Sequence, residues 1–293
     1  MVAAGLVFAT GLAGCSIGGA KKAGGETASE PAVARIAQLT DSNQLQLPLE
    51  EFMPTEQDRA QIQAAYRLRL RQCVEQFGLD YSPAVGSSSA LTTGRNARRY
   101  GVTDQSQVSV YGYHVPPEVG GGKPVQQQLS AQVETVLSGR GTSTVNGRTV
   151  PAGGCVATAK ADLKTDQPGA DDTLADRLSL ESFSRSRADS RVRAAMSHWS
   201  ACMKQQGFNY ATPENAIGDP QFASGDVASR TEISTALADV ACKRTTNLVG
   251  IWATVESAYQ TRSVGQNQEA LNALRKNQAE QVKNAARLSS LPQ

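Results

Sequence analysis

Cysteine and histidine are the residues of this chain whose types and spacing best suit covalent modification, metal binding or catalysis. The chain has five cysteines and two histidines, His114 and His198. A thiol can carry a lipid, form a disulfide or bind a metal ion, and a histidine can act as a general base or a metal ligand. The spacing contains no C-x2-C pair and no H-x3-H pair, which argues against a metal site. We therefore expect a lipid and disulfides, with no metal ion and no cofactor.

The first cysteine, Cys15, closes the motif LAGC at the end of an apolar run. Residues 2–14 carry no charge and have the composition of the apolar region of a signal peptide, but they are too few to span a bilayer. The small residues before Cys15 are what a lipoprotein signal peptidase requires. We therefore predict a signal peptide over residues 1–14 and fatty acyl chains such as palmitate on Cys15. Two acyl chains suffice for stable anchoring, which predicts a location on the outer face of the cell membrane.

Two features around this motif lead to further expectations. A signal peptide carries basic residues before its apolar run, and none precedes this one, so we expect a natural start codon upstream of Met1. The stretch after Cys15 is rich in Gly, Ala, Ser and charged residues and has no apolar periodicity. We interpret residues 15–52 as the lipidated cysteine followed by a flexible tether.

The four other cysteines form an even set, and export to an oxidising compartment makes disulfides their expected state. Three pairings are possible. Cys73 opens CVEQFGLDY and Cys202 opens CMKQQGFNY, so each begins a C-x4-G-x2-Y unit. If each unit is closed by its own disulfide, Cys73 pairs with Cys155 and Cys202 pairs with Cys242, and the repeat favours this pairing.

Helical periodicity surrounds both repeated motifs. Thr55 and Asp58 resemble a capping box at the start of one helix, and Gly78 and Gly207 are placed to end helices in the left-handed conformation. Each cysteine falls on the apolar stripe of its helix. The two stripes are Ile62, Tyr66, Leu70, Cys73 and Phe77, and Val192, Ala195, Met196, Trp199, Cys202 and Met203.

The C-terminal part is also predicted to be helical. Ser229 and Glu232 form another capping-box pattern, followed by apolar periodicity as far as Tyr259. This pattern fits one long helix or two helices with a bend near Gly250. The last stretch is amphipathic but has few large apolar residues, and it could dock on the body, project into solvent or meet a partner. We favour docking.

These patterns divide the mature chain into a first helical unit over residues 53–188, a second over residues 189–263 and a C-terminal amphipathic helix over residues 264–293. The first unit carries an insertion at about 85–150, in which Asn146-Gly147 between β-forming residues predicts a two-residue hairpin. Loops on a rigid scaffold often carry function, so this insertion is where we would look for a functional surface. We favour the simpler interpretation, a variable surface loop.

Catalytic motifs are absent from the sequence. It contains no G-x-S-x-G, S-x-x-K, H-E-x-x-H or G-x4-G-K-[ST] pattern. His114 is the best available general base, whereas His198, at the edge of the Trp199 stripe, is predicted to be a half-buried histidine. The acidic cluster Asp171, Asp172 and Asp176 lacks the spacing of a calcium loop and is better explained by a helix start. We therefore assign no catalytic, cofactor-binding or metal-binding residue.

The overall charge argues against a nucleic-acid partner. The net charge is +2 and aromatic residues make up 5% of the chain, too few for a platform on which bases would stack. The partners we expect are the membrane, through the lipid anchor, and an envelope protein or cell-wall component.

The segments HWSACMKQQGFNYATP, ADVACK, RRYGVTD, VYGYH and PAGGCVATAKADL, with the LAGC motif, resemble a group of uncharacterised secreted lipoproteins of actinobacteria. The resemblance covers residues 53 to 262. It implies a lipid-anchored envelope protein and supplies no activity.

The sequence thus predicts a mainly α fold, a disulfide-linked helical array of two repeat-like units with a small β-hairpin insertion. The predicted function is that of a lipid-anchored cell-envelope protein, a non-catalytic binding or interaction protein. The alternative is an envelope-directed hydrolase with His114 as its base.

Overall fold

The computed structural model describes residues 29–43, 45–83, 94–116, 128–165, 170–223, 225 and 227–290. The chain divides into two compact units, Met1–Glu30 and Pro31–Gln293, and every element below belongs to the second. The predicted signal peptide, Cys15 and the tether up to residue 28 lie outside the described residues.

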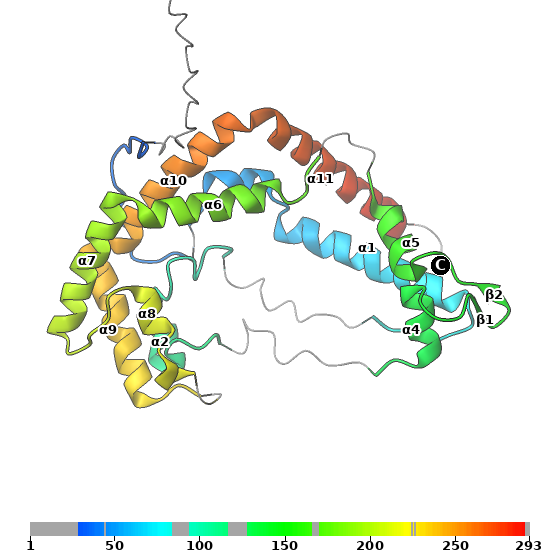
Figure 1. The fold of residues 1–293 in the computed structure, drawn as a ribbon, viewed down its shortest axis with the longest axis horizontal. Coiled ribbons are helices and arrows are strands. Elements are labelled where there is room, and N and C mark those ends of the chain that lie inside the picture. The colour runs from blue at the N-terminus through cyan, green and yellow to red at the C-terminus, as the bar shows by residue number, and fades with distance from the viewer. Residues whose placement is uncertain are drawn as a thin grey trace, which may run out of the picture. The chain divides into compact units, whose positions relative to one another are not determined.

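The described part is mainly helical, as predicted, with one small hairpin (Figure 1). The α-helices are α1 (Glu56–Glu75), α2 (Gln105–Tyr111), α4 (Ala131–Ser138), α5 (Gly154–Leu163), α6 (Leu174–Ala188), α7 (Ser190–Gln205), α8 (Pro213–Ile217), α9 (Arg230–Thr246), α10 (Leu248–Gln266) and α11 (Gln268–Ser289). The shorter elements are the 3-10 helices η1 (Pro48–Phe52) and η3 (Pro220–Phe222) and the strands β1 (Thr144–Val145) and β2 (Arg148–Thr149). No described helix is both long enough and apolar enough to cross a membrane.

Local signals in the sequence set several of these boundaries. The Thr55 hydroxyl accepts a hydrogen bond from the Asp58 amide while the Asp58 carboxylate accepts one from the Thr55 amide, which completes the predicted capping box of α1. Asn146 and Gly147 have φ values of 47° and 75°, as the tight turn between β1 and β2 requires. These determinants lie within a few residues of the element that they specify.

Two of the interhelical connections are disulfides. Cys73 on α1 is bonded to Cys155 on α5, and Cys202 on α7 is bonded to Cys242 on α9. This is the pairing that the repeated C-x4-G-x2-Y unit favoured. Each bond joins two helices that also pack against each other.

The largest hydrophobic cluster lies among α7, α9 and α10, around the buried rings of Trp199 and Trp252. A second cluster joins α1, α4, α5 and the hairpin, where Asn146 donates a hydrogen bond to the Phe77 carbonyl. Two smaller clusters place the apolar face of α11 against η1 and α6 and against α1 and α5. The C-terminal helix therefore docks on the body, as favoured from the sequence.

The described part of the insertion that precedes residue 117 is well packed. Four of its buried apolar side chains belong to the largest cluster, together with helices predicted for the second unit. They are Tyr100, Val102, Val108 and Tyr113. Residues 84–93 and 117–127 of the insertion lie outside the described residues.

The long apolar stretch near the C-terminus forms two helices. The break falls at Asn247, which has a φ of 50°, three residues before Gly250. The Asn247 side chain accepts a hydrogen bond from the Leu39 amide and donates one to the Ala37 carbonyl, so that it ties the N-terminal segment to this corner.

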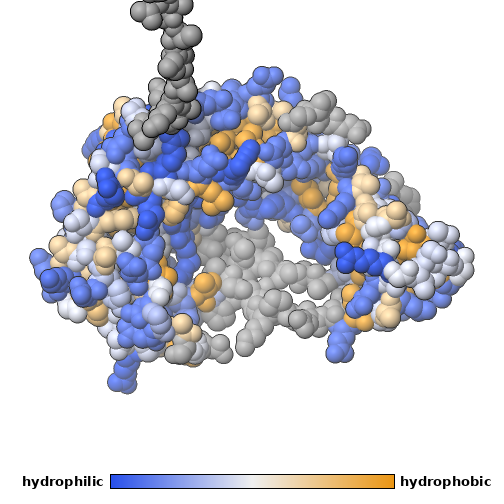
Figure 2. All heavy atoms as spheres, viewed as in Figure 1, coloured by the Kyte–Doolittle hydropathy of each residue, from blue (hydrophilic) through white to orange (hydrophobic). Residues whose placement is uncertain are grey.

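The surface mixes apolar and polar side chains. On the face shown in Figure 2, hydrophobic residues gather in small patches among hydrophilic ones. The exposed large apolar side chains of the described residues are scattered over several elements, which is ordinary for a protein surface. They are Ile36, Val110, Val115, Leu180 and Val227.

Candidate functional site

A groove of about 830 Å³ lies between α1, α5 and α11. This volume falls within the range of about 300–1,000 Å³ that is typical of ligand sites. The groove is lined by Ile62, Gln63, Tyr66, Ala157, Lys160, Ala161, Leu163, Lys164, Thr165, Ala170, Asp172, Asn277 and Gln281.

The walls of the groove are held by contacts that flank it. The disulfide Cys73–Cys155 joins α1 to α5 at one end. The Arg69 guanidinium lies 2.7 Å from the Asp162 carboxylate and forms a second link between the same two helices. The third wall, α11, packs through small and apolar side chains against α1 and α5.

The floor of the groove is apolar. Ile62 and Tyr66 lie one turn apart on α1, and Ala157 and Ala161 lie one turn apart on α5, so each pair presents one face of its helix to the groove. Burial raises the pKa of Tyr66, so its hydroxyl is neutral at physiological pH. These four side chains therefore offer an apolar chain a surface that carries no charge of its own.

One end of the groove is polar and internally hydrogen-bonded. The buried Asn277 amide donates a hydrogen bond of 2.6 Å to the Asp172 carboxylate and accepts one from the Thr165 hydroxyl. The Gln281 amide donates to the other Asp172 oxygen at 3.4 Å. Both carboxylate oxygens thus have amide partners, which fixes the only acidic side chain among the described residues that line the groove.

Two exposed lysines border the groove at the C-terminal end of α5. Lys160 lies in the last turn of the helix, and Lys164 is the residue that directly follows it. Neither forms an ion pair among the described residues. The groove thus combines an apolar floor, an amide-rich end and two cationic groups.

The predicted base, His114, lies outside this groove, just after α2. Its Nε2 is 3.4 Å from a carboxylate oxygen of the buried Glu232, and no hydrogen bond to this nitrogen is formed among the described residues. The other Glu232 oxygen accepts a hydrogen bond of 2.8 Å from the Tyr113 amide. Gly112, with a φ of 55°, permits this close approach, because a Cβ there would lie 2.6 Å from the carboxylate.

The surroundings of His114 do not form a substrate site among the described residues. The adjoining cavity has a volume of about 20 Å³, room for one water-sized molecule. No hydrogen bond connects the ring to a described serine, threonine or cysteine. The carboxylate of Glu232 therefore serves to hold the chain after α2 against α9.

A buried polar cluster lies further along α9. The Asp239 carboxylate accepts hydrogen bonds from the indole of Trp199 at 2.9 Å and from the ammonium of Lys243 at 3.0 Å, and Lys243 also donates to the Val102 carbonyl. Burial raises the pKa of Asp239 against the opposing attraction of Lys243. Burial, together with the negative charge of Asp239, also raises the pKa of Tyr113, which keeps its phenol neutral.

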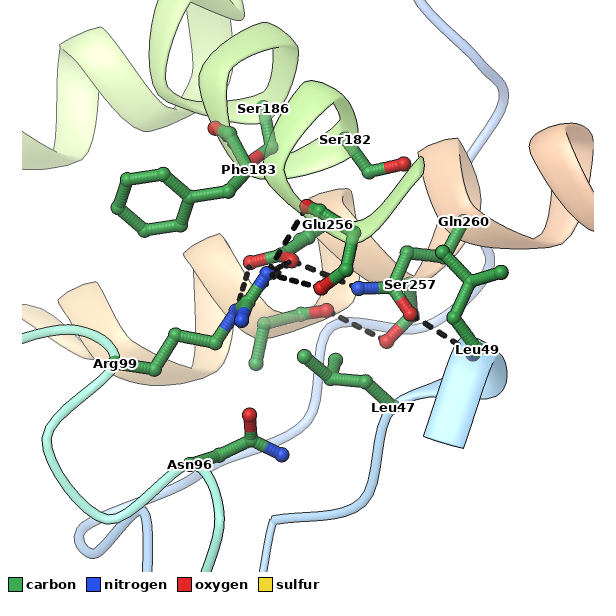
Figure 3. A network of polar contacts seen from close by, with 12 residues as sticks. Leu47, Leu49, Asn96, Arg99, Ser182, Phe183, Ser186, Glu256, Ser257 and Gln260 are labelled. Carbon is green, nitrogen blue, oxygen red and sulfur yellow. Dashed lines mark hydrogen bonds and ion pairs between the residues drawn. The ribbon is translucent and has the colours of Figure 1, made fainter. Parts of the chain in front are cut away.

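A second buried network joins residues 94–116 to α10 (Figure 3). The Arg99 guanidinium donates to both oxygens of Glu256, and Glu256 also accepts hydrogen bonds from Tyr100 and Gln260. Burial opposes the charge of Arg99, but the hydrogen bond and ion pair to Glu256 outweigh it and raise the pKa of Arg99. In both networks the charged side chains bind one another or neighbouring groups of the core. We therefore assign them a structural role.

The other candidate residues predicted from the sequence, His198 and the acidic cluster, do not form a common site among the described residues. His198 is exposed on α7, so the prediction of a half-buried side chain is wrong: it projects from the outer face of the helix, away from the Trp199 stripe. Asp171 pairs with Arg177, and Asp172 binds the amides of α11. No group of acidic, histidine and cysteine side chains suited to a metal ion occurs among the described residues.

The groove could not be predicted from the sequence, because its walls come from three distant segments, α1, α5 and α11. The available signal was the interruption of the apolar stripe of α11 by Gln278 and Gln281. Comparison of the chain with protein-family models, with curated proteins and with solved structures gives no match. The resemblance to secreted actinobacterial lipoproteins therefore stays a prediction.

Proposed function

We propose that this chain is a non-catalytic binding protein of the cell envelope, which holds a ligand in the groove between α1, α5 and α11. The observation that carries the proposal is the groove itself, which has the volume of a ligand site, a mostly apolar floor and a few polar groups at its edges. The walls are fixed by a disulfide and an interhelical ion pair, so the site is largely preformed.

The proposal also places the protein on the outer face of the cell membrane, anchored by a lipid on Cys15. The LAGC motif supports lipid attachment, and two disulfides support an oxidising compartment. In cells that express the frame extended upstream of Met1, we expect labelled fatty acid to enter the protein and Cys15→Ser to abolish the labelling. Labelling that survives this substitution would contradict the anchor.

Ligand binding can be tested in intact cells with the full chain. A photo-reactive phenylalanine derivative would replace Gln63, which is exposed and lines the groove. The matched control would carry the same residue at Leu180, which is 67% exposed on α6 and does not line the groove. We expect an irradiation-dependent adduct of defined mass from position 63 alone, and equal labelling at both positions, or none, would refute the proposal.

The hydrolase alternative depends on His114. Such an enzyme needs a nucleophile or a water within hydrogen-bond reach of the imidazole and a site that admits a substrate. The ring instead faces the buried Glu232 carboxylate, beside a cavity of about 20 Å³. An envelope hydrolytic activity that disappears in His114→Ala while the fold is retained would favour the enzyme over the binding protein.

A further inference from the structure

The groove between α1, α5 and α11 has a chemistry that selects one class of ligand. We infer that it binds an anionic monoacyl amphiphile, a molecule with one apolar chain and one negatively charged headgroup. The chain would cover the floor formed by α1 and α5, and the headgroup would lie between Lys160 and Lys164. This inference rests on the proposed binding function and names the ligand class for it.

Charge is the first argument. Lys160, in the last turn of α5, and Lys164, which directly follows the helix, both line the groove, and neither forms an ion pair among the described residues. Neither nearby carboxylate pairs with a lysine: Asp162 pairs with Arg69, and Asp172 accepts hydrogen bonds from two neutral amides of α11. The two ammonium groups are therefore available to an anionic headgroup.

The position of the lysines relative to the apolar floor is the second argument. Cations at a helix C-terminus complement its dipole, which explains why a lysine is favourable at the end of α5. That effect does not require an apolar surface beside it. Here Ile62, Tyr66 and Ala161 line the same groove as the lysines, so a bound molecule would meet apolar and cationic surfaces together.

The dimensions are the third argument. The lining residues of α5 run from Ala157 to Leu163, which corresponds to a length of about 9 Å along the helix axis, and Lys164 follows directly. The floor is one turn wide on α1 and is closed on its other side by Asn277 and Gln281 of α11. This geometry suits a single chain with its charged end at Lys164.

The test uses residues 31–293, a compact unit with its own cores, produced in an oxidising compartment. Isothermal titration calorimetry at low ionic strength would compare decanoate, decyltrimethylammonium and acetate. Both amphiphiles would be used below the concentration at which they form micelles. We expect saturable one-to-one binding of decanoate, binding of the cation at least about tenfold weaker, and no binding of acetate. Equal affinity for the anion and the cation would overturn the inference, because binding would then depend on the chain alone.

Two pairs of variants locate the binding. Lys160→Gln with Lys164→Gln removes both charges and keeps the helix propensity at position 160, and we expect decanoate to bind about tenfold more weakly. The control, Lys276→Gln with Lys283→Gln, removes two charges from exposed positions of α11 that do not line the groove, and it should bind decanoate as the unchanged protein does. Equal weakening in both double variants would overturn the inference.

The second pair of variants tests whether the groove itself must be open for decanoate to bind. Ala161→Trp places an indole in the groove from an exposed position of α5 and should abolish decanoate binding. Ala194→Trp, exposed on α7 and outside the groove, should leave it unchanged. Unchanged binding in Ala161→Trp would overturn the inference.

These experiments distinguish an error in the ligand class from an error in the proposed binding function. If decanoate fails to bind while the adduct at position 63 forms in cells, the ligand class is wrong and the binding function stands. If decanoate binds with the expected selectivity while no adduct forms in cells, the groove has the inferred chemistry and the proposed function is wrong.

Discussion

Removing Arg99 gives the sharpest test of the buried network that holds residues 94–116 on α10. Glu256 is fully buried, whereas the Arg99 side chain is 18% exposed. Arg99→Met would leave the carboxylate buried with only the neutral donors of Tyr100 and Gln260, at 2.8 and 2.9 Å. Breaking a buried ion pair in this way costs about 3–5 kcal/mol, and the two remaining donors place the expected loss near 3 kcal/mol.

The network predicts that Glu256→Gln has opposite effects on the free energy of unfolding with and without Arg99. Glu256→Gln in the unchanged protein should lower the free energy of unfolding by about 2 kcal/mol, because Arg99 loses its charged partner. The same substitution in the Arg99→Met background removes an uncompensated buried charge and keeps an acceptor for Tyr100. There it should raise the free energy of unfolding by about 1–2 kcal/mol.

Urea unfolding followed by tryptophan fluorescence would measure both effects. The Trp252 ring lies 5.0 Å from the Tyr100 ring, so its emission reports on this region. With a urea m-value of about 3 kcal/mol per molar, a loss of 3 kcal/mol shifts the midpoint by about 1 M. The control is Arg177→Met, which breaks an exposed ion pair with Asp171 and should cost less than about 1 kcal/mol. If Glu256→Gln destabilises both backgrounds equally, the buried pair does not act as described.

Three further sets of substitutions test other parts of the fold. Replacing Cys73 and Cys155 by alanine opens a loop of 82 residues and should lower the free energy of unfolding by about 4.5 kcal/mol, measured by urea titration under oxidising conditions. Burial opposes the charge of Asp189, but hydrogen bonds and an ion pair with Arg191 outweigh it and lower the pKa of Asp189. The carboxylate therefore contributes stability above its unfolded pKa of about 3.9, and this contribution is lost as the pH falls through the lower folded value, so the stability difference from Asp189→Asn should shrink between pH 6 and pH 3. Asn247→Ala should be about 1 kcal/mol less stable than Asn247→Gly, because the φ of 50° strains an alanine, and thermal unfolding of the two variants compares them.

The elements that could be predicted from the sequence are those specified by neighbouring residues. The hairpin follows from Asn146-Gly147, and the start of α1 follows from Thr55 and Asp58. The disulfide pairing was accessible because a repeated motif reduced three possibilities to one favoured choice. The hairpin and the capping box each needed only a short stretch of chain, whereas the pairing needed a comparison of two distant motifs.

Tertiary contacts altered two local predictions near α9. The Ser229 side chain caps the Glu232 amide, but the Glu232 carboxylate is drawn to the Tyr113 amide and does not complete the capping box. The break after α9 falls at Asn247, whose amide is bonded to Leu39, 208 residues away. A sequence window around either residue does not contain its partner.

The groove was missed for a related reason, and α11 shows why. Positions 271, 274, 278, 281, 285 and 288 form one continuous stripe with spacings of three and four residues. Apolar residues occupy both ends of the stripe, where Leu271 and Leu274 pack on η1 and α6 and where Ala285 and Leu288 pack on α1 and α5.

The middle of the same stripe is made of amides. Gln278 donates a hydrogen bond to the Phe52 carbonyl, Asn277 beside it is buried, and Gln281 lines the groove. The scarcity of large apolar residues, which left the role of this helix open at the level of sequence, therefore coincides with the segment that borders the groove. A stripe of this kind, apolar at both ends and rich in amides between, has the pattern of a helix that packs at its ends and binds along its middle, and its interruption is the one sequence signal of the site.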